Sequence, residues 1–346
     1  MKYCIYLKKT EPLVSFSSGE HIFPAGIGGI QKLPVEYVSH ECNNAFSKME
    51  LEFMRDSIIS IPRQFSGPGK RGNLSIKKST KSKVSILNSL EHPDKLEFGY
   101  ISLGKAFIIP QIKIDTFGAC SFTADVSFGD SKTVIKNFIN TIEKSKKKYI
   151  FFEGDNFKNN EFLLGIYNGK LYLGLNSKEN INYFEKTMQE IISKKLLYNV
   201  DPIYKSSRLE VNQTLKMDLN IYFRVCAKII FNYLSYIKGQ EFVIRDCFDP
   251  LRNWIVNSGE NEFVKLVQEK KFFKILDFPK DSHKIVIFKK GNSLMGYVSF
   301  YGETFQNKIV LCENFNESFE IKMFICDWKQ RKEFSLPQFL EQINKK

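Results

Sequence analysis

The segment that most constrains how this chain folds is Glu20–Pro24, an apolar run opened by an acid and a histidine and soon followed by Gly28-Gly29. Two adjacent glycines supply the positive-φ freedom that a tight turn needs. A second short apolar run, Val35 to Val38, lies at the right distance to return as the partner strand. The pattern therefore predicts a β-hairpin with Glu20 and His21 on its first strand.

A helix is expected directly after this hairpin, over the run from Asn43 to Met54. Its apolar residues recur at helical spacing and fall near one face: Phe46, Met49, Phe53 and Met54. Hairpin and helix together make a ββα unit, in which Asn43 occupies the first helical turn. Its side chain can then meet those of Glu20 and His21 in space.

These three residues are the types that one-metal hydrolysis of a phosphodiester needs. A hard cation such as Mg²⁺ prefers oxygen ligands and keeps several waters, so the Glu20 carboxylate and the Asn43 carbonyl leave room for phosphate oxygens. The metal neutralises developing charge, while a neutral imidazole takes a proton from the attacking water. An unperturbed histidine pKa of ~6.5 leaves His21 mostly neutral at physiological pH. We therefore expect His21 as the general base, with Glu20 and Asn43 as ligands of Mg²⁺ or Mn²⁺.

The same motifs resemble those of the HNH endonucleases, also called His-Me-finger or ββα-metal nucleases. The likeness covers residues 1 to about 55 and follows a branch pattern of C-x-x-C, then E-H-x-x-P-x-x-x-G-G, then C-x-x-C-N. The resemblance implies a metal-dependent nuclease, usually acting on DNA, with the family's base at His21 and its metal ligands at Glu20 and Asn43. Ser47, one turn after Asn43, stands at a further ligand position where many members carry His or Asn.

The four-cysteine zinc site of many relatives is only half present. Cys4 and Cys42 match its pattern, whereas the other two positions are Leu7 and Ser39. Tetrahedral zinc needs four ligands and His40 is the one substitute considered, so a structural Zn²⁺ is not expected. Cys4 and Cys42 then form a vestige of the site, and bracing of the finger has to come from packing against the rest of the chain.

A strongly basic stretch follows the expected finger. The whole chain carries 51 Lys and Arg against 38 Asp and Glu, a formal net charge of +13. No acidic residue occurs from Ser57 to Leu90, where the basic residues are Arg63, Lys70, Arg71, Lys77, Lys78, Lys81 and Lys83. The glycines and proline of residues 66–72 predict a flexible loop. We expect this arm to hold nucleic-acid phosphates, the alternative being a solvated surface loop.

Length and composition predict a folded protein of two or three units. The 346 residues are 43% hydrophobic and 14% aromatic, which is ample for packed cores. No run approaches ~18 uncharged apolar residues, so no membrane partner is expected, and no signal-peptide pattern follows Met1. Seven scattered cysteines suit a reducing cytoplasm better than a disulfide framework.

The expected fold class is α+β. An N-terminal ββα-metal finger takes residues 1–62, a basic loop or linker takes 63–95, and an α+β region for substrate recognition or assembly takes 96–346, with a sub-boundary near 180. Periodicity predicts strands within 96–128, one of them over 107–114, and strands within 149–175 with a hairpin turn at Asn168-Gly169. It also predicts helices over 130–148, 182–197 and 219–238, and an antiparallel meander over 283–326 followed by a short helix at 336–343.

The helix expected over 219–238 carries Arg224 and Lys228 one turn apart. Many long members of the resembled family have a similar segment, here Cys226–Ile229, followed by one like Phe248–Arg252. Two interpretations stay open. The charges are a helix cap with surface ion pairs, or they line a basic groove for the second strand of a duplex.

Three functions compete at this point. The first is a metal-dependent DNA endonuclease in phage defence, restriction or mobile-element biology. The second is a catalytically weakened HNH fold that serves as a DNA-binding or complex-forming subunit. The third is a ribonuclease, because the same base and metal act on RNA once its phosphate is reached. A homo-oligomer, or a protein partner in a defence system, stays open as well.

Overall fold

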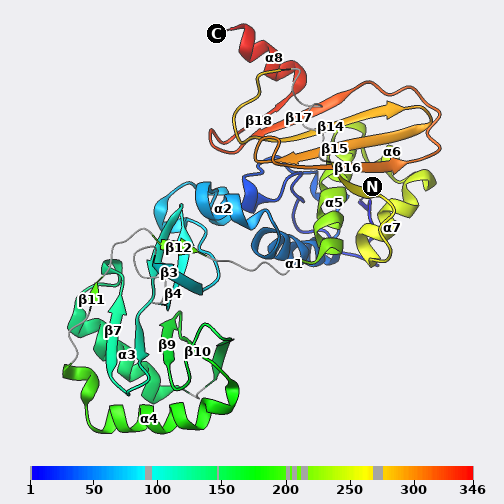
Figure 1. The fold of residues 1–346 in the computed structure, drawn as a ribbon. Helices are drawn as coiled ribbons and strands as arrows, with labels where there is room; N and C mark the ends of the chain where they lie inside the picture. The colour runs from blue at the N-terminus through cyan, green and yellow to red at the C-terminus, as the bar shows by residue number, and fades with distance from the viewer. Residues whose placement is uncertain are drawn as a thin grey trace. The chain divides into compact units, whose positions relative to one another are not determined.

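The computed structural model describes residues 2–89, 96–145, 148–199, 203–204, 209–211, 217–267 and 276–345. These residues form two compact units. Unit 1 holds the described residues of 1–80 and 215–346, and unit 2 holds those of 81–214 (Figure 1). Unit 2 is therefore inserted into the sequence of unit 1.

The α+β class with several antiparallel sheets is confirmed, whereas the division of the chain differs from the predicted one. The expected 63–95 linker is shared between the two units, and the single region expected over 96–346 is cut at about residue 214. The sub-boundary expected near 180 falls inside unit 2. An insertion of this kind leaves no mark in composition, because the two parts of unit 1 are brought together by tertiary packing between segments far apart in the sequence.

Unit 1 is built on a six-stranded antiparallel sheet in the order β13-β16-β15-β14-β17-β18. Its strands are β13 (Val264–Val267), β14 (His283–Lys290), β15 (Ser293–Phe300), β16 (Phe305–Cys312), β17 (Lys322–Asp327) and β18 (Lys332–Ser335). The predicted meander is thereby confirmed, with Gly291 at φ +60° in the turn between β14 and β15. Because side chains alternate along a strand, Ile285 and Ile287 face one core while Val286 faces another.

Helix α5 (Leu219–Lys238) lies across the first face of this sheet, with the bounds that the apolar periodicity predicted (Figure 1). It packs closely at Gly296 of β15, where a Cβ would lie 2.8 Å from side-chain carbons of Ile230. The short elements after it are α6 (Gln240–Val243), η8 (Asp246–Phe248) and α7 (Asp249–Asn257). On the opposite face, α8 (Leu336–Asn344) packs through Phe339.

The N-terminal residues of unit 1 belong to the same core as α5 and the sheet. Their elements are β1 (Tyr3–Cys4), β2 (Lys9–Thr10), η1 (Ala25–Ile27), η2 (Val35–Tyr37), α1 (His40–Asp56), α2 (Ser60–Ser66), η3 (Lys70–Gly72) and η4 (Ile76–Lys78). Phe53 of α1 stacks on Tyr222 of α5 at 5.4 Å between ring centroids, and Phe23 stacks on Phe324 of β17 at 6.1 Å. The segment predicted as a separate finger is therefore one side of a larger core.

Unit 2 contains a mixed six-stranded sheet, in the order β11-β7-β6-β9-β10-β8, and a four-stranded antiparallel sheet, β12-β3-β4-β5. The strands are β3 (Ser85–Ser89), β4 (Leu96–Ser102), β5 (Lys105–Ile108), β6 (Gln111–Ile114), β7 (Cys120–Ala124), β8 (Tyr149–Glu153), β9 (Phe162–Tyr167), β10 (Lys170–Leu175), β11 (Ile203–Tyr204) and β12 (Leu209–Val211). The helical elements are η5 (Val126–Phe128), α3 (Ser131–Lys144), η6 (Lys178–Asn180), α4 (Ile181–Ser193) and η7 (Leu196–Asn199).

The two faces of the larger sheet have separate cores. Phe162 and Leu164 of β9 face α3 and α4, whereas Leu163 faces the four-stranded sheet. The run predicted as one strand over 107–114 is broken at Pro110 into β5 and β6, which belong to different sheets, because proline cannot donate to a strand ladder. Among the described helices of both units, none is long and apolar enough to cross a lipid bilayer.

Candidate functional site

The predicted hairpin is a closed loop over residues 20–33, with one antiparallel bridge between His21 and Lys32. Two further main-chain hydrogen bonds, of 3.0 and 2.8 Å, close the loop. The return strand expected at 35–38 is wrong, because residues 31–33 do the pairing and η2 takes its place. Pro34 has a φ of −51°, which suits the start of a helical turn, and this explains the difference.

The tip of this loop is locked onto the sheet of unit 1. Gly28 has a φ of +104° and lies directly against Trp328, so neither the backbone nor the space allows a Cβ there. On the other side of the tip, His283 Nε2 lies 2.9 Å from the Ile27 carbonyl oxygen. The glycine pair was predicted to form a turn. The structure shows in addition that Gly28 lets the loop backbone lie directly against Trp328.

The predicted helix is α1, but it begins at His40 rather than at Asn43. Ser39 caps it by accepting the Cys42 amide at 3.4 Å, which places Asn43 in the first turn. The Asn43 side-chain amide donates to Ser18 Oγ at 3.0 Å, so this helix end is joined to the segment that leads into Glu20 and His21. The structure thus brings the three predicted residues to adjacent segments.

Ser47 is less suited to the ligand position expected of it. It is exposed, and its hydroxyl donates to the Asn44 carbonyl at 2.9 Å, in the pattern by which serine bonds to its own helix. Its oxygen is a neutral and weaker donor to a cation than the His or Asn of the resembled family.

His21 is half-buried, and its main-chain carbonyl accepts a hydrogen bond of 2.8 Å from Asn232 of α5. Burial is the largest influence on its side chain and lowers the pKa of His21 to about 4. The positive charges of Lys32 and Lys228 act in the same direction, against the opposing charge of Glu20. The imidazole is therefore neutral at physiological pH, the form that accepts a proton.

Glu20 faces the interior, where it meets a buried lysine that sequence reasoning did not assign to the site. Lys228 Nζ lies 2.6 Å from Glu20 Oε1 and also contacts the Glu50 carboxylate of α1. The side chains of Lys228, Glu20 and Glu50 are 0%, 4% and 14% exposed. The ammonium also lies 5.5 Å from the Phe46 ring centroid, within range of a cation–π contact. We call Glu20, Lys228 and Glu50 the buried triad.

The charges of the buried triad depend on one another. Burial on its own would lower the pKa of Lys228, but the two carboxylates outweigh it, so this pKa is raised and the side chain is an ammonium ion. Burial raises the pKa of Glu50, with a further push from Glu20 and an opposing pull from Lys228. When both acids are ionised the triad carries one negative charge in excess.

Asn232 lies one helical turn after Lys228 on α5 and binds two parts of the N-terminal segment. Its side-chain oxygen accepts the Tyr6 hydroxyl at 2.6 Å, while its amide donates to His21. Lys228 and Asn232 therefore hold Glu20 and His21 from the same helix face. The signal in the sequence was a lysine and an asparagine four positions apart within a helical run that is otherwise apolar.

The basic groove considered for this helix is wrong, because its cations are used internally. Arg224 donates to the carbonyls of Ile255 and Val256, at the end of α7. Arg252 is 1% exposed and is paired with Asp249. The other interpretation, a cap with surface ion pairs, fits Arg224 but not Lys228 or Arg252, which are buried.

Cys4 and Cys42 do meet, with 3.9 Å between their sulfur atoms, and both are buried. The contact with Cys42 is the largest cause that lowers the pKa of Cys4 to about 5, and the same contact raises the pKa of Cys42. The Ser39 amide donates to Cys4 Sγ at 3.4 Å and also lowers the pKa of Cys4.

His40, the substitute zinc ligand, faces away from this pair. Its Nδ1 lies 2.8 Å from Ser17 Oγ and its Nε2 lies 2.9 Å from Asn44 Nδ2, so both ring nitrogens have other partners. Across the described ranges, no three His, Cys, Asp or Glu side chains are grouped as a metal site requires.

The basic stretch is not one surface. Arg63 is buried at the end of α2 and donates to the carbonyls of Gly26 and Met54, so its predicted contact with nucleic acid is wrong. Lys81 and Lys83 belong to unit 2, where Lys81 lies over the Tyr100 ring at 4.9 Å. The residues that stay exposed on unit 1 are Lys70, Arg71, Lys77 and Lys78.

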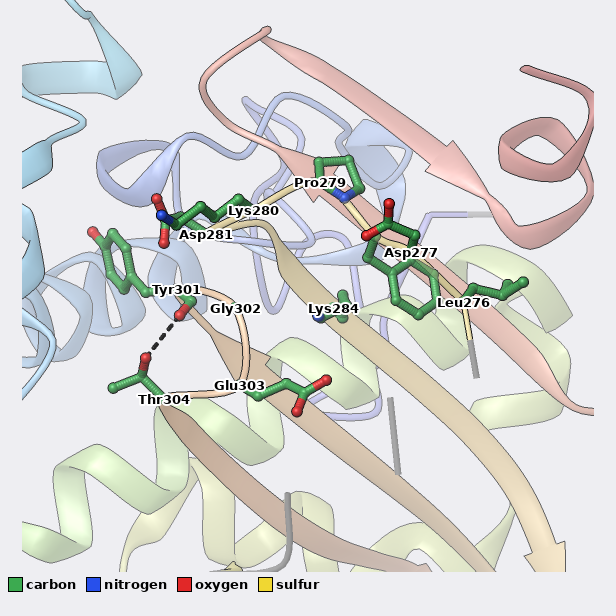
Figure 2. Close-up of a pocket in the computed structure, with 11 residues that line it drawn as sticks. Leu276, Asp277, Pro279, Lys280, Asp281, Lys284, Tyr301, Gly302, Glu303 and Thr304 are labelled. Atoms are coloured by element: carbon green, nitrogen blue, oxygen red, sulfur yellow. Dashed lines mark hydrogen bonds between the residues drawn. The ribbon is translucent and has the colours of Figure 1, made fainter. Parts of the chain in front are cut away.

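A pocket of about 620 Å³ opens elsewhere on unit 1, where β14 begins and β15 turns into β16 (Figure 2). Its charged lining is mixed, with Asp277, Asp281 and Glu303 against Lys280 and Lys284. None of the predicted site residues lines it. In Figure 2 the Thr304 hydroxyl donates to the Tyr301 carbonyl at 2.9 Å, which closes the turn at the pocket's edge.

The oxygen atoms of Glu20 and Asn43 are of the type that a hard divalent cation binds while it keeps most of its waters. The Glu20 carboxylate hydrogen-bonds to Lys228 and to no other described residue, and no described residue donates to the Asn43 side-chain carbonyl. When both acids of the buried triad are ionised, their one excess negative charge is a charge that such a cation would offset. Glu20 and Asn43 are thus the residues that would hold a metal here.

Comparison with protein-family models, with curated proteins and with solved structures finds no match for this chain. The chemistry of the residues around His21 is therefore the basis for a functional proposal.

Proposed function

We propose that this chain is a metal-dependent phosphodiester hydrolase of the HNH type that cleaves DNA. One observation carries the proposal. A neutral, half-buried His21 is held by its own main chain beside the buried carboxylate of Glu20, on a segment joined through Ser18 to Asn43.

In this proposal His21 takes the proton of the attacking water. The lowered pKa keeps the imidazole unprotonated throughout the neutral range, so the base is ready without prior deprotonation. The hydrogen bond from Asn232 fixes the main chain at His21 and so the point from which the ring projects, which matters because a misplaced base loses rate steeply. A cation held by Glu20 and Asn43 would supply charge neutralisation at the phosphate and stabilise the leaving oxygen.

Lys228 has a supporting role, since its side chain is fully buried and cannot touch a substrate. It neutralises part of the charge on Glu20 and fixes the direction of that carboxylate. DNA is the proposed substrate because the finger segment is followed by exposed cations, and phage defence or restriction is the biological setting that we propose with it.

The second candidate is a catalytically weakened HNH fold that binds DNA without cutting it. It is favoured by two observations: Glu20 is already paired with an ammonium ion, and Ser47 offers only a helix-bonded hydroxyl at a ligand position. A ribonuclease is the third candidate, and it uses the same residues on another substrate.

The deciding experiment is nicking of supercoiled plasmid with added Mg²⁺ or Mn²⁺, beside labelled RNA. We expect the wild type to nick DNA and His21→Ala to lose this activity by about 10²-fold or more, since general bases contribute at least that much. His40→Ala is the matched control, because His40 is an exposed histidine at the start of α1 whose ring bonds to Ser17 and Asn44.

Equal nicking by wild type and His21→Ala would refute the assignment of the base. DNA binding without cleavage by either protein would establish the second candidate. Cleavage restricted to RNA would establish the third.

A further inference from the structure

The loop that follows α2 exposes aliphatic side chains among lysines. Ile76, in η4, is 79% exposed and Leu74 is 46% exposed. Lys77 and Lys78 follow Ile76 directly. An isoleucine side chain with this exposed fraction contributes little to the core, so another role has to explain why it is exposed here.

Several hydrogen bonds tie together this loop, which its glycines predicted to be a flexible arm. We define the 67–80 loop as Gly67 to Thr80. Its two ends are tied together, since the Thr80 hydroxyl donates to the Pro68 carbonyl at 3.2 Å, and the Gly69 amide donates to the Asn73 carbonyl at 2.8 Å. The Asn73 side chain accepts the Ser75 amide at 2.8 Å and so sets the start of η4.

The 67–80 loop is also braced against the segment that carries the candidate site. A Cβ on Gly72 would lie 3.1 Å from the Ala25 carbonyl and 3.2 Å from Gly28 Cα, at the tip of the 20–33 loop. Arg331 donates to the Gly72 carbonyl at 3.3 Å, and the Tyr301 hydroxyl donates to the Gly67 carbonyl at 3.0 Å. Ile76 is therefore presented on a fixed support.

The charged residues of the 67–80 loop are all basic. Lys70, Arg71, Lys77 and Lys78 are exposed, and no carboxylate of the described residues pairs with any of them. The sequence contains no acidic residue from 57 to 90. The surface therefore fits a polyanion whose interior is apolar, which is the chemistry of stacked bases between phosphate backbones.

We propose that the 67–80 loop is a duplex-distorting wedge, in which Ile76 enters a base step of DNA while the four cations contact the flanking phosphates. This deepens the proposed function, on which it rests for the choice of DNA as the polyanion. Insertion of an aliphatic side chain between bases unstacks them and kinks the duplex. Because unstacking is easiest at mismatches and at flexible pyrimidine–purine steps, the wedge favours such sites.

Two other occupants of this surface fit less well. A membrane surface also combines anionic groups with an apolar interior, but stable anchoring uses a whole amphipathic helix face or acyl chains rather than one or two aliphatic side chains. A second copy of this chain that docked through the same surface would bring four cations against four cations, which repel one another.

The test measures binding to short duplexes without divalent metal, so that cleavage plays no part. Full-length wild type is compared with Ile76→Ser on a perfect duplex and on one with a central mismatch flanked by 2-aminopurine, over a series of salt concentrations. Ile321→Ser is the matched control, because Ile321 is also a highly exposed isoleucine of unit 1, 64% exposed, with charged neighbours.

We expect wild type to prefer the mismatched duplex and to raise 2-aminopurine fluorescence. Ile76→Ser should lose about 5-fold to 10-fold in affinity for the mismatched duplex, together with the fluorescence rise, while its salt dependence stays unchanged. Lys77→Gln with Lys78→Gln should weaken binding to both duplexes and lower the salt slope by about 2. Ile321→Ser should bind as wild type does.

The proposal is overturned if Ile76→Ser binds both duplexes as wild type does, if wild type binds neither duplex, or if Ile76 is needed instead for binding to phosphatidylserine vesicles. Ile76-dependent binding by a wild type that fails to nick plasmid would support the wedge and reject the nuclease. Metal-dependent nicking with no effect of Ile76→Ser would do the reverse.

Discussion

Lys228 shows how far the chemistry of one residue depends on its surroundings. On sequence grounds it was a charged position on a helix, suited to solvent or to a phosphate. In the structure it is fully buried, and its ammonium group contacts the carboxylates of both Glu20 and Glu50. The same residue type that is exposed at Lys77 and Lys78, with no carboxylate partner among the described residues, is thus an internal counter-ion at position 228.

Replacement of the buried ammonium should destabilise unit 1 strongly. Lys228→Met leaves two carboxylates facing each other in the interior, and breaking a buried pair of this kind costs about 3–5 kcal/mol. Glu50→Gln should cost less, because burial already raises the pKa of Glu50 toward its neutral form. Urea unfolding followed by tryptophan fluorescence measures both changes.

The control for this comparison is Lys48→Met, an exposed lysine on α1, which should change the free energy of unfolding by less than about 0.5 kcal/mol. A Lys228→Met protein as stable as the control would show that the buried triad contributes nothing to stability.

His283 gives unit 1 a defined sensitivity to acid. Burial lowers its pKa to about 3 from an ordinary value of 6.5, with its ring between the Ile27 carbonyl and the Tyr301 amide. Below its ordinary pKa the unfolded chain binds a proton that the folded chain refuses, so stability is full near neutrality and falls with falling pH. For one histidine the loss between about pH 7 and about pH 5 is about 2 kcal/mol.

Urea unfolding at several pH values should show this loss in the wild type, and a smaller pH dependence in His283→Gln. His40→Gln, at an exposed position, should keep the wild-type dependence. Parallel pH curves for wild type and His283→Gln would contradict the assignment of this titration to His283.

At the scale of elements, local sequence patterns predicted the type and bounds of several helices and strands, but they did not predict which segments pair with one another. The bounds of α5, the meander of unit 1 and the Asn168-Gly169 turn between β9 and β10 all agree with the periodicity and turn residues of the sequence. The return strand at 35–38 and the unbroken strand at 107–114 are the failures, and a proline decides each of them.

The Gly28 turn offers a test of close approach between elements. Gly28 and Gly291 both have positive φ, but only Gly28 lies against a neighbour, Trp328, while Gly291 faces open space. Gly291→Ala should therefore cost only the backbone penalty, about 1 kcal/mol. Gly28→Ala should cost at least about 2 kcal/mol more, because the chain also has to move away from the sheet.

Thermal and urea unfolding of the two variants decide the point. Equal destabilisation by Gly28→Ala and Gly291→Ala would mean that the loop tip is free to shift from Trp328.

At the scale of the whole molecule, the finger segment depends on residues more than two hundred positions away. Tyr6 packs on Phe46 within the segment and on Phe231 of α5, and its hydroxyl bonds to Asn232. Unit 2, by contrast, has cores of its own on both faces of its larger sheet. The N-terminal segment therefore shares its core with distant residues of unit 1, whereas unit 2 has cores of its own. The predicted arrangement, an independent finger followed by a recognition region, implied the opposite.

Isolated fragments of the chain should show this difference between the two segments. Residues 81–214 expressed alone should fold cooperatively, because both of their cores are internal. Residues 1–80 alone should stay largely unfolded, since α5 and the sheet supply the other half of their core and the cation for Glu20.

Circular dichroism and the dispersion of amide signals in NMR spectra measure both fragments. A folded 1–80 fragment would show that the N-terminal segment is an independent domain after all.

The sequence by itself determined most element types and the turn glycines, and it supplied the prediction of His21, Glu20 and Asn43 as site residues, because periodicity, turn chemistry and the choice of side-chain groups are local properties. Only the tertiary structure decided that Glu20 pairs with Lys228, 208 positions along the chain, that Arg63 is internal, and that the described residues of 81–214 form a compact unit of their own. The physical reason is that a charge becomes a phosphate contact or a counter-ion according to its desolvation and its neighbours. Packing brings those neighbours together from distant parts of the chain.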